Sequence, residues 1–324
     1  CVITIISRHL GVGFFYICCM NKIIFIFFLF TSILSNAQDT LMPVIFLDDV
    51  VISEDNNGFS VEDFIGYVKN DTTFYLGFKH LRYYQHKYNS ELNIYNKKNT
   101  KIGSLNRVGT HFSDSKDAWT VDDSIYFDGK IYKRNGSYRL YTPEAFDEVF
   151  FPNDTISVSL EISKSKNTDE SQNMRDAKTI GFSIGTDNVE QSKGGVKKKL
   201  AIFDIDMQRY YNYIISDTTY NDIPCYVFSV KVKEDLDKNQ REKALIRKVL
   251  SYFDKSNFNV IYREYKFVYD NWFIKLDMDV IVNLDYLNNI HVPTNISYNG
   301  FWKVLFFKAE RTDFKLRLYD YILE

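Results

Sequence analysis

The chain has 324 residues, of which 45% are hydrophobic, 25% charged and 17% aromatic, and its formal net charge is −2. This apolar content excludes intrinsic disorder, and the near balance of 40 basic and 42 acidic residues gives no broad positive surface for a nucleic acid. Its four cysteines are too few for a disulfide scaffold. The 24 Tyr and 27 Phe, against 14 Gly and 5 Pro, favour β structure, because aromatic side chains suit strands and bury large areas.

A segment that begins at Met20 has the layout of a secretory signal peptide. Asn21 and Lys22 give a short basic start, an apolar run over 23–34 follows, and Ser35-Asn36-Ala37 resembles a cleavage signal. The run is shorter than the roughly 20 apolar residues that span a membrane as a helix. We expect cleavage after Ala37, with 1–19 upstream of the true start; an uncleaved anchor is the alternative.

The mature chain, 38–324, is expected to be one large β-rich domain, or two halves separated by the polar stretch 163–199. It would be exported to the periplasm, the outer membrane or the cell surface, with no spanning helix. Cleavage leaves Cys225 as its one cysteine, which we interpret as a small buried side chain in a strand.

The first part of the mature chain predicts a strand followed by two helices. Residues 41–52 are strand-like. Ser60 and then Asp71 or Thr72 have the residue types of helix N-caps, each before apolar residues at helical spacing. The period then changes from about 3.6 to 2, which predicts strands near 92–94 and 102–112 joined by a turn.

Turn signals dominate the next region. Asp128-Gly129 and Asn135-Gly136 predict two hairpins with type I′ turns. Thr142-Pro143-Glu144 opens a predicted helix that ends at Phe150. A strand is expected over 156–162, and from 200 onwards an antiparallel meander with room for one short helix between Asn239 and Leu250.

The clearest pattern lies between Trp272 and Tyr286, where every even position is apolar and most odd positions are polar. Such alternation predicts one strand with one dry face, and 15 residues at about 3.3 Å each would span roughly 50 Å. A strand of this length suits a strongly curved sheet.

The preceding strand, 259–269, is expected to pair with it through a two-residue turn at Asp270-Asn271. This register sets Phe267 opposite Ile274 and Tyr265 opposite Leu276, and it brings Lys266 opposite Lys275. The predicted ligand-binding face then consists of one set of side chains: Arg263, Tyr265, Phe267, Trp272, Ile274, Leu276 and Met278. Arg263 has two interpretations, a side chain with its stem on the core and its head in water, or a polar anchor at the mouth of an apolar cavity.

Motifs for catalysis and cofactors are weak. Gly181-Phe-Ser183-Ile-Gly185 matches the serine-hydrolase elbow, but a poor helix-former follows it. His80, His86, His111 and His291 have no metal-ligand spacing, so we expect no metal site and no cofactor. Asp277 and Asp279 share a strand face and could hold a cation or act as an acid pair, although exposed carboxylates at this spacing are usually only solvated.

The layout resembles the half-barrel proteins of lipoprotein carriage. The resemblance is carried by the helical segment from Ser60 to Tyr84 and by the strand-rich segment from Cys225 to Tyr321. The leader and the aromatic strands are also similar to those of other exported proteins of Gram-negative bacteria. The fold class expected is β-rich α+β, a strongly curved antiparallel meander (half-barrel or open barrel) with two or three short helices near the N-terminus. The resemblance implies an apolar concavity that holds acyl chains between the sheet and its covering helices.

Three functions stay open from sequence. The first is an exported non-enzymatic binding protein whose apolar concave face takes a lipid or lipoprotein acyl chain, or an extended segment of an envelope protein. The second is an outer-membrane β-barrel protein. The third is a serine hydrolase that uses Ser183.

Overall fold

The computed structural model describes eleven stretches of the chain. They are 50–52, 64, 66–68, 71, 73–114, 116–152, 155–158, 202–270, 272, 274–304 and 308–323. All of them belong to one compact unit, Ile45–Glu324. The predicted leader with its cleavage after Ala37, the polar stretch 163–199 and Ser183 lie outside the described residues.

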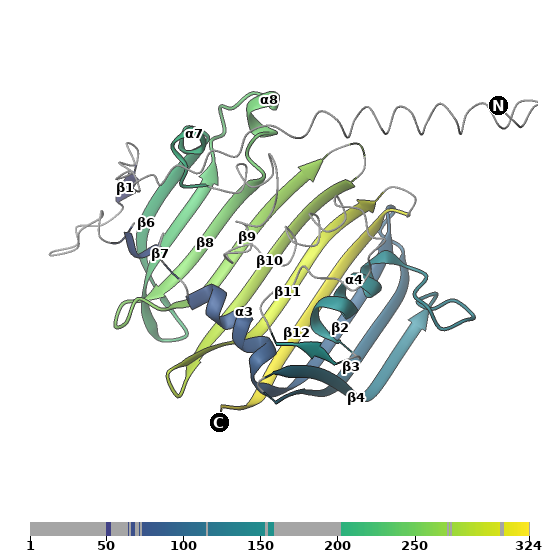
Figure 1. Ribbon diagram of the computed structural model, residues 1–324. Helices are drawn as coiled ribbons and strands as arrows, with labels where there is room; N and C mark the ends of the chain where they lie inside the picture. The colour runs from purple at the N-terminus through teal and green to yellow at the C-terminus, as the bar shows by residue number, and fades with distance from the viewer. Residues whose placement is uncertain are drawn as a thin grey trace, which may run out of the picture. The chain divides into compact units, whose positions relative to one another are not determined.

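The described strands form a 12-stranded sheet in the order β1-β6-β7-β8-β9-β10-β11-β12-β2-β3-β4-β5 (Figure 1). Their bounds are β1 Val50–Ile52, β2 Gln85–Asn96, β3 Lys101–Ser113, β4 Asp117–Gly129, β5 Ile156–Ser157, β6 Tyr211–Tyr220, β7 Ile223–Val232, β8 Ile246–Asp254, β9 Val260–Asp270, β10 Ile274–Leu287, β11 Ile290–Val304 and β12 Glu310–Ile322. β1 runs parallel to β6 and the other pairs are antiparallel. The sheet is not closed, and β6 to β12 follow one another as the predicted meander, which confirms the expected fold class.

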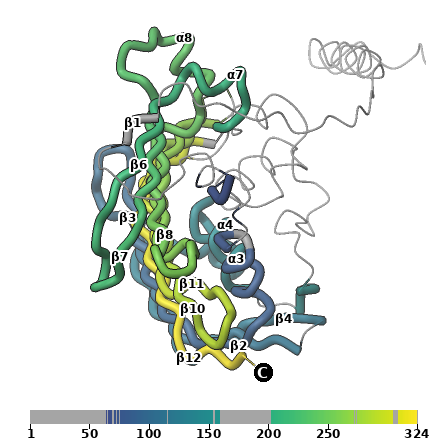
Figure 2. Tube along the Cα trace, turned by 90° about the vertical axis from the view of Figure 1, so that its left-hand side faces the viewer, coloured from purple at the N-terminus to yellow at the C-terminus, as the bar shows by residue number. Residues whose placement is uncertain are grey.

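Two helices cover the inner face of the sheet, α3 (Thr73–Tyr83) and α4 (Tyr141–Phe150), and Figure 2 shows both on the same side of the strands. The carboxylate of Asp71 accepts a hydrogen bond of 2.9 Å from the backbone N–H of Thr73, so Asp71 is the predicted cap. The shorter helices are α7 (Ile205–Gln208) and α8 (Lys238–Arg241). The short helix expected after Asn239 thus ends early, and Ile246 already starts β8.

The alternation in β10 is confirmed through most of its length. Its inward side chains, from Ile274 through Leu276, Met278 and Val280 to Val282, are at most 2% exposed. Helix α3 approaches this strand closely at Gly77, where an added Cβ would lie 2.6 Å from a methyl carbon of Leu284. A glycine at this position therefore sets the distance between the helix and the sheet.

The register predicted for β9 and β10 is wrong by four residues. Leu276 lies opposite Tyr269, and Met278 lies opposite Phe267, so the faces are kept while the connection becomes longer. The electrostatic reason is visible on the outer face, because Lys266 now lies opposite Asp279 instead of Lys275. Its ammonium contacts Asp279 at 2.9 Å, whereas the predicted register brought two lysines together.

Of the two predicted hairpins, the Asn-Gly hairpin forms and the Asp-Gly hairpin does not, and neither has the predicted type I′ turn. β4 continues to Gly129, with Phe127 opposite Leu105 of β3, so a full-length partner edge overrides the local turn preference. Asn135-Gly136 does form a tight turn, closed by a bridge between Tyr132 and Tyr138. In both pairs only the glycine has a positive φ, and a type I′ turn would require it of both residues.

The observed register predicts which cysteine pair can be oxidised to a disulfide. In a background with Cys1, Cys18, Cys19 and Cys225 replaced by Ala, Lys266→Cys with Asp279→Cys should cross-link readily, because facing Cα atoms are about 4.5–5.5 Å apart. Lys266→Cys with Lys275→Cys is the matched control. Its Cα atoms are separated by about four residues along the strand, roughly 13 Å, so it should stay reduced. Mass spectrometry of the oxidised proteins measures both, and a cross-link only in the control would contradict the observed register.

Candidate functional site

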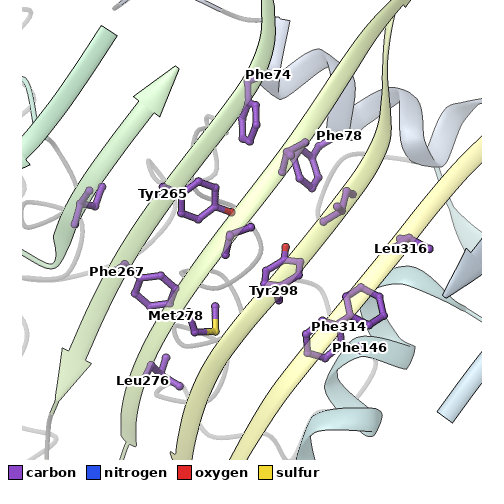
Figure 3. Packing of buried hydrophobic residues seen from close by; sticks show 14 of the residues in the cluster. Phe74, Phe78, Phe146, Tyr265, Phe267, Leu276, Met278, Tyr298, Phe314 and Leu316 are labelled. Carbon is purple, nitrogen blue, oxygen red and sulfur yellow. The ribbon is translucent and has the colours of Figure 1, made fainter. Parts of the chain in front are cut away.

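Five of the seven predicted binding-face residues lie together on the inner face of the sheet. They are Tyr265, Phe267, Ile274, Leu276 and Met278, each at most 2% exposed. Figure 3 shows how Phe74 and Phe78 of α3 and Phe146 of α4 pack over this face. We call these side chains, with Tyr298, Phe314 and Leu316, the apolar layer. In this structure the layer is filled by the protein's own side chains.

The other two predicted face residues are placed differently. Trp272 is 76% exposed and lies in the connection between β9 and β10, because the longer connection removes it from the strand. Arg263 is on the inner face but its head is not in water. Its guanidinium forms an ion pair of 3.1 Å with Asp71, and both side chains are largely buried.

Arg263 fastens the start of α3 to the sheet. Its Nε donates to Ser251 Oγ at 2.9 Å, and the guanidinium carbon lies 4.4 Å from the centre of the Phe74 ring. Burial lowers the pKa of Arg263, and the charge of Asp71 opposes that shift. A second contact at the same end runs from the backbone N–H of Val260 to Thr73 Oγ1 at 3.3 Å.

The apolar layer also contains two fully buried hydroxyl groups, those of Tyr265 and Tyr298. The two hydroxyls interact electrostatically with each other, and burial raises the pKa of both. Figure 3 shows the two oxygens among carbon side chains. They give an otherwise apolar layer a small polar spot that stays protonated at neutral pH.

A small pocket lies where the ends of α3 and α4 meet the sheet. Apolar side chains from both helices and β12 form its walls: Leu81, Val149, Phe150, Leu316 and Leu318. Arg82, His86 and His111 supply its polar side. The free space is about 10 Å³, which is room for roughly one water molecule.

The two histidines of this pocket face each other across β2 and β3, with ring centres 4.7 Å apart. His86 Nδ1 lies 2.9 Å from the carbonyl oxygen of Tyr84, and His111 Nε2 lies 3.1 Å from that of Arg82. Because carbonyls only accept, these nitrogens carry the protons. Burial lowers the pKa of His86 to about 3 and that of His111 to about 4, so both rings are neutral at pH 7.

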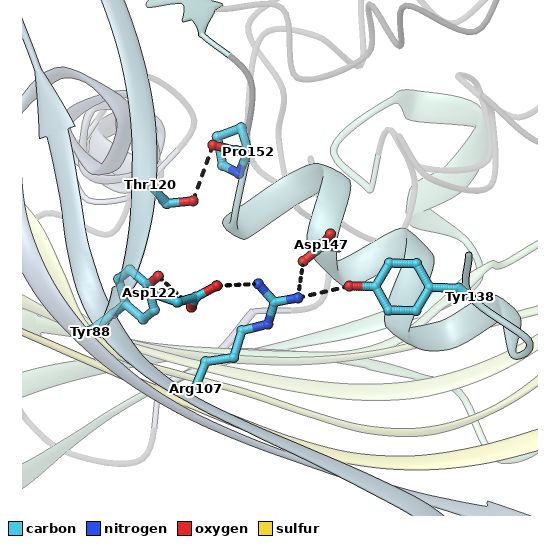
Figure 4. A network of polar contacts seen from close by, with 7 residues as sticks. All are labelled: Tyr88, Arg107, Thr120, Asp122, Tyr138, Asp147 and Pro152. Atoms are coloured by element: carbon cyan, nitrogen blue, oxygen red, sulfur yellow. Dashed lines mark hydrogen bonds and ion pairs between the residues drawn. The ribbon is translucent and has the colours of Figure 1, made fainter. Parts of the chain in front are cut away.

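Beside the pocket lies a buried charge network centred on Arg107, whose side chain is 3% exposed (Figure 4). Its guanidinium pairs with Asp122 at 2.9 Å and with Asp147 of α4 at 2.6 Å, and it donates to the hydroxyl of Tyr138. Tyr88 donates to Asp122 at 2.9 Å. Burial raises the pKa of Asp147 to about 6 in spite of the attraction of Arg107.

The start of α4 is held by a different acid. Glu310 of β12 is 2% exposed, and its carboxylate accepts hydrogen bonds from the backbone N–H groups of Tyr141 and Thr142 at 3.0 and 2.9 Å. A carboxylate at a helix N-terminus satisfies unpaired donors and interacts favourably with the helix dipole. α4 is thus fixed to the sheet at both ends by charged groups.

The remaining sequence candidates do not form a site among the described residues. Asp277 and Asp279 both contact Lys266, at 3.3 and 2.9 Å, so they are a charge-paired part of the outer face. Cys225 is buried, as predicted. The described part of the chain holds no group of three His, Cys, Asp or Glu side chains that could bind a metal ion. None of its helices is long and apolar enough to cross a membrane.

Sequence reasoning missed Arg82, Arg107 and Glu310. Arg107 and Glu310 each occupy an inward position of an alternating strand, so a charged residue at an inward position was the available signal. The partners, Asp147 and the start of α4, lie far away in the sequence and follow no local pattern.

No known family model matches the sequence, and neither does any curated protein. Solved structures with a similar arrangement include a DUF1329 family protein from Desulfovibrio piger, with 12% identity, 77% of this chain and 91% of that chain covered, and a TM-score of 0.23. A putative outer membrane lipoprotein-sorting protein domain from Vibrio parahaemolyticus has 12% identity, coverage of 76% and 91%, and a TM-score of 0.23. Lipovitellin, whose structure is described as showing lipid–protein interactions, has 9% identity, coverage of 74% and 25%, and a TM-score of 0.25. One of these structures is thus a lipoprotein-sorting protein domain, the class of protein that the layout resembles.

The histidine pair predicts loss of stability in acid. Because the folded pKa values of about 3 and 4 lie below the unfolded value near 6.5, the unfolded chain binds protons that the folded chain refuses. The contribution of the two neutral histidines to the free energy of unfolding is therefore fully present above pH 6.5, and it is lost as the pH falls towards 4. Replacing either ring, as in His86→Asn or His111→Gln, should reduce the slope of unfolding free energy against pH by about 1.4 kcal/mol per pH unit. Urea unfolding between pH 6.5 and 4.5 measures it, and unchanged slopes in both variants would refute the assignment.

Asp147 predicts the opposite change of folding stability with pH. Its folded pKa of about 6 lies above the unfolded value near 3.9, so its contribution is complete below pH 3.9 and is lost as the pH rises through 6. Asp147→Asn should therefore gain stability relative to the parent between pH 4 and pH 7, by up to about 3 kcal/mol. Glu148→Gln removes an exposed carboxylate from the same helical turn and should show little change. If Asp147→Asn instead became relatively less stable towards pH 7, attraction to Arg107 would dominate over burial.

Proposed function

We propose that this chain is an exported, non-enzymatic binding protein that takes an acyl chain into the apolar layer between its curved sheet and helices α3 and α4. The observation that carries the proposal is the make-up of that layer. The described side chains between the helices and the sheet are mainly aromatic and aliphatic, and the polar contacts of both helices lie towards their ends. A helix held in this way can be displaced by an apolar ligand that replaces its buried side chains.

The fastenings of α3 are few and peripheral. At its start they are the Arg263–Asp71 pair and the Thr73–Val260 hydrogen bond. Near its end, His80 Nδ1 lies 2.7 Å from the carbonyl oxygen of His291, and His111 Nε2 of β3 lies 3.1 Å from that of Arg82. Between these ends, Phe74 and Phe78 make apolar contacts within the layer, which an acyl chain can substitute.

Rough magnitudes indicate which ligands can open the layer. Breaking a buried ion pair such as Arg263–Asp71 costs about 3–5 kcal/mol. Each methylene removed from water contributes about 0.8 kcal/mol, so a chain of 12 carbons gains about 10 kcal/mol and a chain of four about 3 kcal/mol. Long acyl chains therefore exceed the cost of displacing α3, and short ones do not. In the cell envelope such chains occur in lipids and in lipid-modified proteins, which are the partners we propose.

A reversible lock between α3 and the sheet tests the proposal. Gly77 and Leu284 face each other so closely that Gly77→Cys with Leu284→Cys, in the cysteine-free background described above, should form a disulfide. We expect binding of monolaurin, an uncharged 12-carbon acyl glycerol, to fall at least tenfold on oxidation and to return on reduction. Native mass spectrometry measures the bound fraction.

The control is the Lys266→Cys with Asp279→Cys protein, which carries the same number of thiols but joins β9 to β10 without holding α3. Its monolaurin binding should not respond to oxidation. Absence of monolaurin binding in the reduced lock protein and in the parent chain would refute the proposed function. Binding of an extended peptide with the same response to oxidation would assign the layer to a protein segment instead.

A further inference from the structure

Among the described residues, Arg82, Arg107 and Arg263 lie on or beside the inner face, and Arg82 differs from the other two. Arg107 pairs with Asp122 and Asp147, and Arg263 pairs with Asp71. Arg82, in the last turn of α3, forms no ion pair or side-chain hydrogen bond with any residue in the part of the chain that the structure describes. Its backbone carbonyl is used by His111, but its guanidinium is not matched by a carboxylate.

The surroundings of Arg82 leave its charge uncompensated. The guanidinium is close enough to His111, a neutral ring, to lower the pKa of that ring further by charge repulsion. Burial lowers the pKa of Arg82 itself to about 10, and within the described part of the chain no acidic group opposes that shift. The helix dipole favours a cation in the last turn of α3. It does not explain why this cation lies in the wall of a pocket. Arg82 is thus a partly buried cation without a carboxylate partner in the wall of a pocket, and such a cation is available to a bound anion.

The pocket beside Arg82 joins the apolar layer. Leu316 and Phe150 belong both to the pocket wall and to the buried cluster around Phe314, and Figure 3 shows Leu316 next to Phe314. The protons of His86 and His111 are committed to backbone carbonyls, so Arg82 is the cationic donor that remains in this pocket. A group bound there can therefore continue as an apolar chain into the layer.

We propose that Arg82 binds the carboxylate of a fatty acid whose chain enters the apolar layer. This inference rests on the proposed function and names the head group that the same site prefers. One guanidinium matches a single negative charge, and its planar fork suits the two oxygens of a carboxylate. A phosphate monoester would bring a charge near −2 to one cation, and the free space of about 10 Å³ favours the smaller head group.

The test compares three ligands with the same 12-carbon chain, laurate, dodecyl phosphate and uncharged monolaurin, by isothermal titration calorimetry on the full chain. We expect the parent protein to bind laurate at least tenfold more tightly than monolaurin, and dodecyl phosphate more weakly than laurate. Arg82→Met should bring the laurate-to-monolaurin ratio close to one while monolaurin binding is kept, and Arg82→Lys should retain part of the preference. Arg317→Met, which removes an exposed arginine of β12, is the matched control and should keep the full ratio.

Thermal unfolding of the ligand-free proteins separates binding from a structural role. Removal of an unmatched buried charge should leave the Tm of Arg82→Met unchanged or higher, whereas a structural arginine would lower it. A laurate preference that persists in Arg82→Met, or a preference for dodecyl phosphate, overturns the carboxylate assignment. Monolaurin binding without any preference for laurate in the parent also overturns it and leaves the proposed function in place. If monolaurin fails to bind at all, the proposed function fails separately.

Discussion

An open sheet with one largely apolar face must cover that face, and the rest of this molecule follows from that requirement. Leu276, Met278 and Val280 alternate inward along a 14-residue strand, and none of them reaches solvent. Leaving such a side chain exposed would cost about 1.5–3 kcal/mol each. Helices α3 and α4 supply the cover with phenylalanine rings, which bury large areas and pack edge to face at centroid distances such as the 5.3 Å between Phe146 and Tyr298.

The charged groups of the interior determine where the cover is held. Asp71 and Arg263 fix the start of α3, Glu310 fixes the start of α4, and Arg107 binds the carboxylate of Asp147 in the same helix. These contacts are directional, while the apolar contacts between them are not. The helices therefore have a defined position on the sheet although the layer beneath them would accept other apolar groups.

The sequence was informative wherever a local period carried the information. The alternation of β10, the Asp71 cap and the Thr142-Pro143 helix start were predicted because each depends on residues within a few positions. The register of β9 against β10 was not, because two registers that differ by an even shift bury the same face. The choice between them was made by outer-face charges, Lys266 with Asp279 and Lys275 with Asp270. The candidate site depends on pairs distant in sequence, such as Arg107 and Asp147, for which no local pattern exists.

The close packing of Gly77 against Leu284 restricts the ways in which α3 can move away from the sheet. A helix seated at this separation cannot slide along β10 without collision, so sliding of the two layers past each other is excluded and a swing remains. Tyr84 alone separates the end of α3 from the start of β2, which anchors that end. The pivot must therefore lie beside Tyr84, and the end that travels is the one held by Asp71. The layer would open first at that travelling end and last at Arg82.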